Sequence, residues 1–232
     1  MIIIERRYSG PPDCGNGGYV GGMIAAHVDG NAEVTLRKPT PLDVELTVER
    51  HAGGVRMRNG DTVIATAAPI HDEPLATPSP VSLADAEAAG ERSALRQRPE
   101  THPFPGCFGC GPENDGGLRI MVGPVPGRDL AADVWIPDAT LADSDGVRPE
   151  FVWTALDCSG GLGAIGQEST SAPYLLGRMA VWRLAPVHPG VRYAVVGRRE
   201  GGTGRTLFAG SAIYAADGTP VAVARSTWIQ LT

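Results

Sequence analysis

The same order of structural signals occurs twice along this chain of 232 residues. In each copy an apolar stretch with helical spacing is followed by strands and then by a two-residue hairpin turn. The first copy predicts a helix over 17–27 and a hairpin at Asn59-Gly60, and the second predicts a helix over 149–166 and a hairpin at Asp217-Gly218. Neither copy alternates strands with helices as βαβ folds do, so the duplication predicts two similar α+β units.

The two copies are expected to share one sheet. Each copy alone would leave an unpaired sheet edge and a bare helix face, and pairing the copies covers both. We therefore expect one continuous antiparallel sheet with the two helices packed as a pair on its concave side. The strands predicted after the helices lie at 33–37, 44–48, 55–58 and 62–68 in the first copy, and at 175–184, 191–198 and 220–229 in the second.

A connector separates the copies. Residues 71–105 are rich in proline, alanine, serine and charged residues, and Ser82 with Asp85 forms a capping box that predicts one exposed helix. The predicted domains are therefore an N-terminal repeat over 1–70, the connector over 71–105 and a C-terminal repeat over 106–232.

Charge and hydropathy exclude several classes of function. The net charge of −6 leaves no basic field to collect phosphates, so nucleic acid is not an expected partner. No apolar run reaches the length of a membrane span, and the opening Met1–Ile4 ends at Glu5-Arg6-Arg7, which predicts a strand and not a signal peptide. Four cysteines in this length do not make a disulfide framework, so we expect free thiols in a reducing cytoplasm.

The cysteines and histidines match no familiar metal or nucleophile pattern. Cys107 and Cys110 have half the spacing of a zinc site, but no second pair exists and His102 is the only nearby histidine. A tight turn with reduced thiols and without bound metal is therefore favoured over structural zinc. Cys14 and Cys158 have no base beside them in the sequence, so covalent catalysis by cysteine is a minor alternative. A serine hydrolase is disfavoured because no Gly-x-Ser-x-Gly elbow occurs.

Two stretches resemble a known family. They are Pro-Gly-Cys-Phe-Gly-Cys-Gly-Pro-Glu-Asn at 105–114, followed by Gly-Leu-Arg-Ile at 117–120, and Ala-Leu-Asp at 155–157 with Gly160-Gly161. Both look like the PaaI-type acyl-CoA thioesterases of the hotdog superfamily. The resemblance implies a fused double hotdog that hydrolyses an acyl-CoA or related thioester with water and without metal or organic cofactor. It also allows a homodimer of such chains.

Three alternatives stay open beside this function. A hotdog protein can bind acyl or CoA ligands without catalysis, and it then needs only an apolar tunnel. An enoyl-CoA hydratase would need a paired aspartate and histidine, and the sequence places no such pair in a strand-edge loop. A structural partner protein would expose a broad apolar surface instead of a groove.

Asp157 is the candidate general base. It follows an otherwise apolar or small run, 151–156, that should be buried, and a buried carboxylate is costly unless it is paired or functional. Burial would raise its pKa and leave a carboxylate able to activate water. The alternative interpretation places Asp157 on an exposed helix face or against a nearby backbone amide.

Asn16-Gly17-Gly18 is the second candidate, because a helix N-terminus presents unpaired N–H groups and glycine lets a ligand oxygen come close. In the resembling enzymes this place holds His-Gly-Gly and forms the oxyanion hole for the thioester, which implies substrate binding by Asn16 and a catalytic role for Gly17 and Gly18. The sequence is equally compatible with a simple cap at Asn16 and with glycines that ease helix packing.

The two predicted helices differ in their candidate site residues. In the resembling thioesterases, His-Gly-Gly starts nine residues before the aspartate of the helix, and this spacing can be applied to both helices. The position of the acid in the first helix holds Ala25, and the position of the glycine donors in the second holds Arg148-Pro149-Glu150, where proline has no N–H. We therefore expect one active site per chain, in which the amide of Gly17 or Gly18 polarises the thioester carbonyl and Asp157 activates water.

Overall fold

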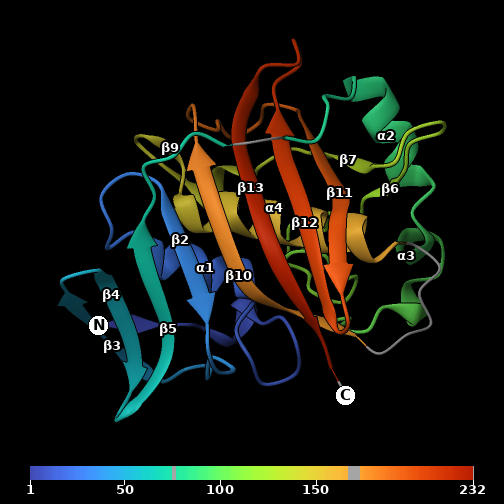
Figure 1. The fold of residues 1–232 in the computed structure, drawn as a ribbon. Helices are drawn as coiled ribbons and strands as arrows, with labels where there is room; N and C mark the ends of the chain where they lie inside the picture. The colour runs from blue at the N-terminus through green and yellow to red at the C-terminus, as the bar shows by residue number, and fades with distance from the viewer. Residues whose placement is uncertain (75–76, 167–172, 232) are drawn as a thin grey trace.

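A computed structural model describes residues 1–74, 77–166 and 173–231 (Figure 1). Within these residues one sheet contains eleven strands, and every pairing in it is antiparallel. From edge to edge, the strands are β1 (Ile2–Ile3), β3 (Glu45–His51), β4 (Gly54–Asn59), β5 (Thr62–Pro69), β2 (Ala32–Leu36), β10 (Tyr174–Arg183), β13 (Pro220–Gln230), β12 (Thr206–Tyr214), β11 (Tyr193–Thr203), β7 (Ala131–Trp135) and β6 (Gly123–Pro124). The predicted strands and the continuous sheet are confirmed.

The two halves of the chain join at the centre of this sheet. Strand β2 of the first half pairs with β10 of the second, with Val34 opposite Met179 and Ala32 opposite Val181. Both hairpin turns predicted from asparagine or aspartate followed by glycine are present, and Gly60 and Gly218 take positive φ angles of 54° and 83°. A small second sheet pairs β8 (Ala142–Asp143) with β9 (Gly146–Val147).

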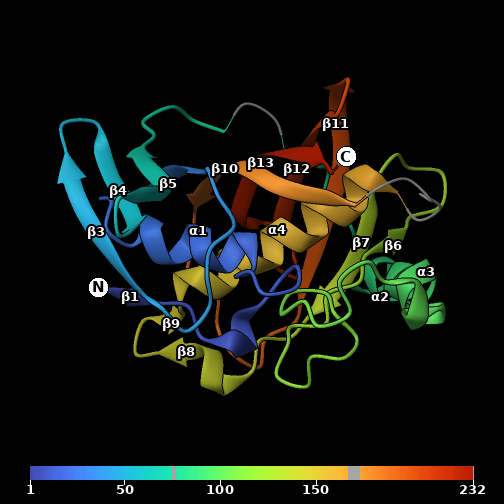
Figure 2. The same cartoon turned by 90° about the horizontal axis from the view of Figure 1, so that it is seen from below.

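Two helices, α1 (Gly17–Ala25) and α4 (Pro149–Ile165), lie side by side on the same face of the sheet (Figures 1 and 2). Asn16 caps α1 by accepting a hydrogen bond from the Tyr19 amide, and Pro149 occupies the first turn of α4, where a missing N–H is harmless. The predicted arrangement of two central helices under one antiparallel sheet is therefore confirmed.

The main core lies between the helices and the sheet, and both halves contribute to it. Ile24 and Leu46 of the first half and Phe151 and Val195 of the second half are fully buried in one cluster. Tyr8 and Tyr19 stack with ring centroids 4.0 Å apart, against Phe108 and Phe151. One core thus crosses the boundary between the two repeats. The division of the chain into 1–70, 71–105 and 106–232 stays a prediction.

The connector contains α2 (Leu83–Glu91) and α3 (Ala94–Gln97), and the helix predicted there is present as α2, with one exposed face and one buried face. Ser82 does cap α2 by accepting from the Asp85 amide, as the capping box predicts. However, Ala86 and Ala89 of α2 are fully buried against the outer face of the sheet around β7. Small residues on the helix and on the sheet let α2 approach the sheet closely. The burial of this helix face therefore depends on the sheet that covers it.

The remaining short elements are 3-10 turns at Arg6–Tyr8, Pro99–Thr101 and Ala139–Leu141. In the described parts of the chain, no helix is both long and apolar enough to cross a membrane.

Candidate functional site

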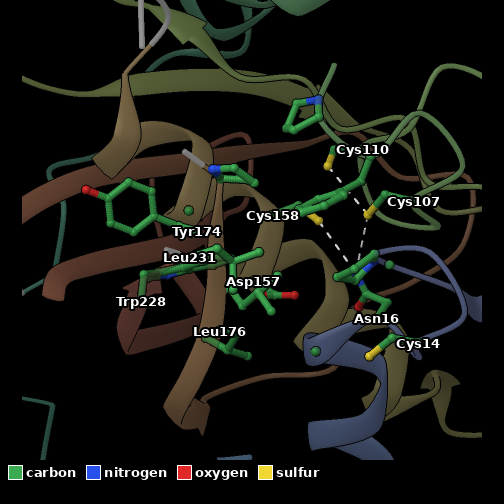
Figure 3. Close-up of a pocket in the computed structure, with 18 of the residues that line it drawn as sticks. Cys14, Asn16, Cys107, Cys110, Asp157, Cys158, Tyr174, Leu176, Trp228 and Leu231 are labelled. Atoms are coloured by element: carbon green, nitrogen blue, oxygen red, sulfur yellow. Dashed lines mark hydrogen bonds between the residues drawn. The ribbon is translucent and has the colours of Figure 1, made fainter. Parts of the chain in front are cut away.

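A cavity of about 920 Å³ lies between the two halves of the chain. Its walls come from the start of α1, the end of β2, the C-terminal half of α4, strands β10 and β13, and the connector segment after α3. Figure 3 shows Tyr174, Trp228 and Leu231 on one side and the thiols of Cys107 and Cys110 on the other, with Asp157 between them. This volume is in the range of pockets that enclose small organic ligands.

Asp157 lines the cavity from the middle of α4 and is only 2% exposed. Its Oδ2 accepts a hydrogen bond of 2.8 Å from the Gly18 amide. Its Oδ1 is buried and has no hydrogen-bond partner among the described residues. Burial raises the pKa of the Asp157 carboxyl to about 8, the Gly18 amide works against this rise, and the nearby Cys107 adds to it.

Gly18 is required by the packing of the helices. A Cβ atom at this position would lie 2.6 Å from the Cβ of Asp157 and 2.7 Å from the carbonyl oxygen of Trp153. One turn later, a Cβ at Gly22 would lie 2.3 Å from the Cα of Glu150. The two glycines therefore let α1 run against α4 closely enough for the Gly18 amide to reach the carboxylate.

Gly17, unlike Gly18, lines the cavity and does not donate to Asp157. It lines the cavity against Leu36 and Leu176, and its amide at the start of α1 has no acceptor among the described residues. Free N–H groups at a helix N-terminus attract developing negative charge. Of the two glycine amides expected to polarise a carbonyl, Gly17 is thus the one whose N–H is available.

Asn16 serves the helix and the site at once. Its Oδ1 accepts from the Tyr19 amide at 2.9 Å, which makes the cap, and it is 3% exposed. Its Nδ2 donates to the sulfur of Cys107 at 3.5 Å and to the sulfur of Cys158 at 3.8 Å (Figure 3). Both interpretations of this residue from the sequence are thus compatible with its position.

Three buried thiols form a cluster next to the carboxylate. The sulfur atoms of Cys107, Cys110 and Cys158 all lie within 4.8 Å of one another. Hydrogen bonds from the thiols of Cys110 and Cys158 hold the pKa of Cys107 well below its ordinary value, and the same hydrogen bonds raise the pKa of both donors. The four cysteines of the chain are free thiols.

His102 also lines the cavity, at 6% exposure. Its Nδ1 accepts from the Phe104 amide at 3.0 Å, which assigns the proton of the neutral ring to Nε2. That Nε2 is buried without a hydrogen-bond partner among the described residues. Burial lowers the pKa of His102, so the ring favours its neutral form.

The equivalent place at the other end of the helix pair is much smaller. There the end of α1 meets the start of α4, and a pocket of about 210 Å³ is lined by Ala25, Pro149 and Trp153 among others. The lining contains no carboxylate and no cysteine in the described residues. The single active site expected from the positions of Ala25 and Pro149 stays a prediction.

The structure thus brings the sequence-predicted residues Asn16, Gly17 and Asp157 into the lining of one cavity, and Gly18, which is not part of that lining, donates to Asp157. Sequence reasoning missed His102, and it missed that Cys158 joins Cys107 and Cys110 as a third thiol. Cys158 directly follows Asp157 in α4, but successive residues of a helix point in different directions, so their adjacency in the sequence did not predict that both line the cavity.

No protein-family model and no curated protein sequence matches the chain. Solved structures do resemble it. A proposed thioesterase II from Thermobifida fusca YX matches with a TM-score of 0.61 at 14% identity, over 100% of this chain and 91% of that one. The acyl-CoA thioesterase II TesB2 from Mycobacterium marinum matches with a TM-score of 0.58 at 11% identity, over 92% and 90%. The dehydratase domain of PpsC from Mycobacterium tuberculosis, in complex with C12:1-CoA, matches with a TM-score of 0.56 at 16% identity, over 94% and 85%.

At these identities the likeness concerns the fold. It extends over nearly the whole length of both chains in each comparison, so both halves and their junction take part in it. Together with the eleven-stranded antiparallel sheet over two paired helices in the described residues, it shows that the chain has the double-hotdog fold in a single polypeptide.

Proposed function

We propose that this protein hydrolyses an acyl-CoA or a related thioester with water. The observation that supports this most is the juxtaposition of Asp157 and Gly17. A buried carboxylate and a helix N-terminal amide line the same mostly apolar cavity, and among the described residues one carboxylate oxygen and the amide N–H have no hydrogen-bond partner. A base for water and a donor for a carbonyl oxygen are the two groups that thioester hydrolysis needs.

In the proposed reaction, Oδ1 of Asp157 takes a proton from a water molecule as the water oxygen bonds to the thioester carbon. The carbonyl oxygen gains the negative charge, and the Gly17 amide stabilises it. The carbon–sulfur bond then breaks, and the thiolate receives the proton that Asp157 holds. The products are a carboxylic acid and a free thiol. Gly18 acts as a positioning residue, because its amide holds Oδ2 of Asp157.

The cavity lining also fits the two parts of such a substrate. Leu36, Leu162, Leu176 and Trp228 supply apolar walls suited to an acyl chain. The exposed side chains of Arg37, Lys38 and Arg98 belong to the same lining, and cations are suited to the phosphates of coenzyme A. Two of the proteins that share the fold are named for acyl-CoA: one as a thioesterase, the other as a dehydratase domain in complex with C12:1-CoA.

Thiol release from a panel of acyl-CoA esters, from short to long and including aromatic acyl groups, tests the proposal. The Asp157→Asn variant should lose about a hundredfold or more in turnover on the best substrate, because the amide cannot accept the proton from water. Asp133→Asn is a matched control, since Asp133 is a carboxylate of similar burial, 4% exposed, outside the cavity. Near-normal hydrolysis by Asp157→Asn would overturn the role of Asp157.

One observation favours a second candidate, hydration of an enoyl-CoA. His102 and Asp157 both line the cavity, and each has a buried polar atom without a partner in the part of the chain that the structure describes, although the sequence showed no such pair. The two reactions separate in one assay, because hydration removes the conjugated double bond without releasing thiol. Loss of the enoyl absorbance in the wild type, abolished in His102→Ala, would favour the hydratase. Binding of acyl-CoA without either reaction would favour a ligand-binding protein.

A further inference from the structure

The three-thiol cluster is not needed for the proposed hydrolysis, yet its construction is specific. Cys107 and Cys110 come from the loop before β6, and Cys158 comes from α4. All three are at least nine-tenths buried, at 5%, 7% and 5% exposure. The loop therefore folds onto the helix so that its two thiols meet the third one, and a Cys-x-x-Cys pair that looked incomplete in the sequence gains a partner.

The loop conformation depends on two glycines. A Cβ atom at Gly109 would lie 2.2 Å from the sulfur of Cys158, and a Cβ at Gly111 would lie 2.4 Å from the backbone nitrogen of Cys107. The Gly111 amide donates to the Cys107 carbonyl at 2.7 Å and closes the turn. Only glycine at both positions lets the loop present two sulfurs to the helix at this distance.

The sulfur separations fit one metal ion. Tetrahedral zinc with bonds to sulfur of about 2.3 Å sets neighbouring sulfurs about 3.8 Å apart. The sulfurs of Cys107 and Cys110 are 3.6 Å apart, and all three lie within 4.8 Å. The Asn16 side-chain amide nitrogen donates to the sulfurs of Cys107 and Cys158. Hydrogen bonds of this kind, from residues that are not themselves ligands, stabilise metal-bound thiolates.

The fourth position of such a site would face the cavity, because all three cysteines line it. His102 does not supply the fourth ligand, since its Nδ1 already accepts from Phe104 and its Nε2 carries the proton. Its Nε2–H, which has no acceptor among the residues described, is instead a donor available in the same cavity lining. A water molecule or a substrate atom is thus the fourth ligand that the geometry leaves room for.

We propose that Cys107, Cys110 and Cys158 bind one zinc ion as three thiolates, with the fourth coordination position open to the cavity. Three thiols lose their protons on binding, so the site is monoanionic when occupied. Thiolate ligands favour zinc over the oxygen-preferring ions calcium and magnesium. The bound ion links the loop before β6 to α4 beside Asp157. This inference goes beyond the proposed hydrolysis and does not depend on it.

The zinc content of the full chain tests the proposal. Protein stripped with a chelator, given zinc and freed of excess by gel filtration should retain about one zinc per chain. Cys107→Ser and Cys158→Ser should lose that zinc, whereas Cys14→Ser should keep it, because Cys14 is the one cysteine outside the cluster. Zinc-free wild type after this treatment, or full zinc in Cys158→Ser, would overturn the proposal.

A second measurement uses only the unmodified protein, so it tests the zinc site even if the cysteine variants fail to fold. Unmodified protein loaded with cobalt(II) should show near-ultraviolet charge-transfer absorption from several thiolate ligands, and added zinc should remove it. Wild type without that absorption would refute the site whatever the variants do. Both measurements are independent of thioester turnover, so a failure of the proposed hydrolysis and a failure of the zinc site give different results.

Discussion

The charged residues that line the cavity differ in their exposure to solvent. Asp157 is fully enclosed, and burial raises its pKa to about 8 although one backbone amide holds it. Arg37, Lys38 and Arg98 lie at the exposed part of the same lining, where water solvates them. The buried acid is therefore suited to proton transfer, and the exposed bases are suited to binding an anionic group.

Reversing one of these exposed charges should affect only substrates that contain phosphate. Arg98→Glu should raise KM for an acyl-CoA about tenfold, because a charge-assisted contact contributes about 1.5–3 kcal/mol and each 1.4 kcal/mol is about a factor of ten. The same acyl group on N-acetylcysteamine, which has no phosphates, should keep its KM. Arg50→Glu makes the same charge change in β3, outside the cavity lining, and serves as control. An equal rise in KM for both thioesters would contradict phosphate binding by Arg98.

At the scale of elements, the contact between α1 and α4 places the donors beside the acid. The helices run antiparallel, because Gly18 faces Trp153 and Asp157 while Gly22 faces Glu150. Glycine at both positions brings the two backbones close, and the sheet above them holds the pair in place (Figure 2). The site geometry is thus a property of the helix pair and not of either helix.

Two alanine substitutions separate packing from positioning. Gly18→Ala and Gly22→Ala should each destabilise the fold by about 1–3 kcal/mol, since the added methyl group forces the helices apart. Gly18→Ala should also reduce turnover more than Gly22→Ala, because only Gly18 donates to Asp157. Urea unfolding and thiol release measure the two effects. Gly106→Ala, where a Cβ meets nothing within 4 Å, should stay within about 0.5 kcal/mol of the wild type. Wild-type stability of Gly22→Ala would refute the close contact.

At the scale of the whole molecule, the β2–β10 junction makes the two repeats one structural unit. The sheet continues through Val34 and Met179, and one core cluster contains residues of both halves. Each repeat alone would expose the edge that the other now covers. The cavity itself lies between the repeats, so the proposed function requires both of them.

A substitution in the first repeat should therefore destabilise the second. Leu46→Ala removes a fully buried side chain of β3 and should cost about 2–5 kcal/mol. All four tryptophans lie in the second repeat, at 135, 153, 182 and 228, so their fluorescence reports on that repeat. The fluorescence midpoint in urea should fall together with that of far-ultraviolet circular dichroism. Val44→Ala, at an exposed neighbouring position, should shift neither. An unchanged tryptophan transition in Leu46→Ala would show that the repeats unfold separately.

Much of the fold was predictable because its signals are local. The helix at Gly17–Ala25, the helix at Pro149–Ile165 and the glycine turns at Gly60 and Gly218 each depend on residues within a few positions. The order in which these signals occur twice predicted the duplicated fold. The burial of α2 was not predictable in this way, because the surface that covers Ala86 and Ala89 comes from strands far away in the sequence.

The sequence by itself determined the two repeats, the carboxylate in an apolar helix at Asp157 and the donors at the start of α1. Only the tertiary structure decided that Gly18 holds that carboxylate, that the Gly17 amide finds no acceptor within the described residues, and that Cys158 meets Cys107 and Cys110. Each of these outcomes depends on how closely α1, α4 and the loop before β6 approach one another. Helix contact and loop folding are set by packing between residues distant in the chain, and local propensity carries no information about such distances.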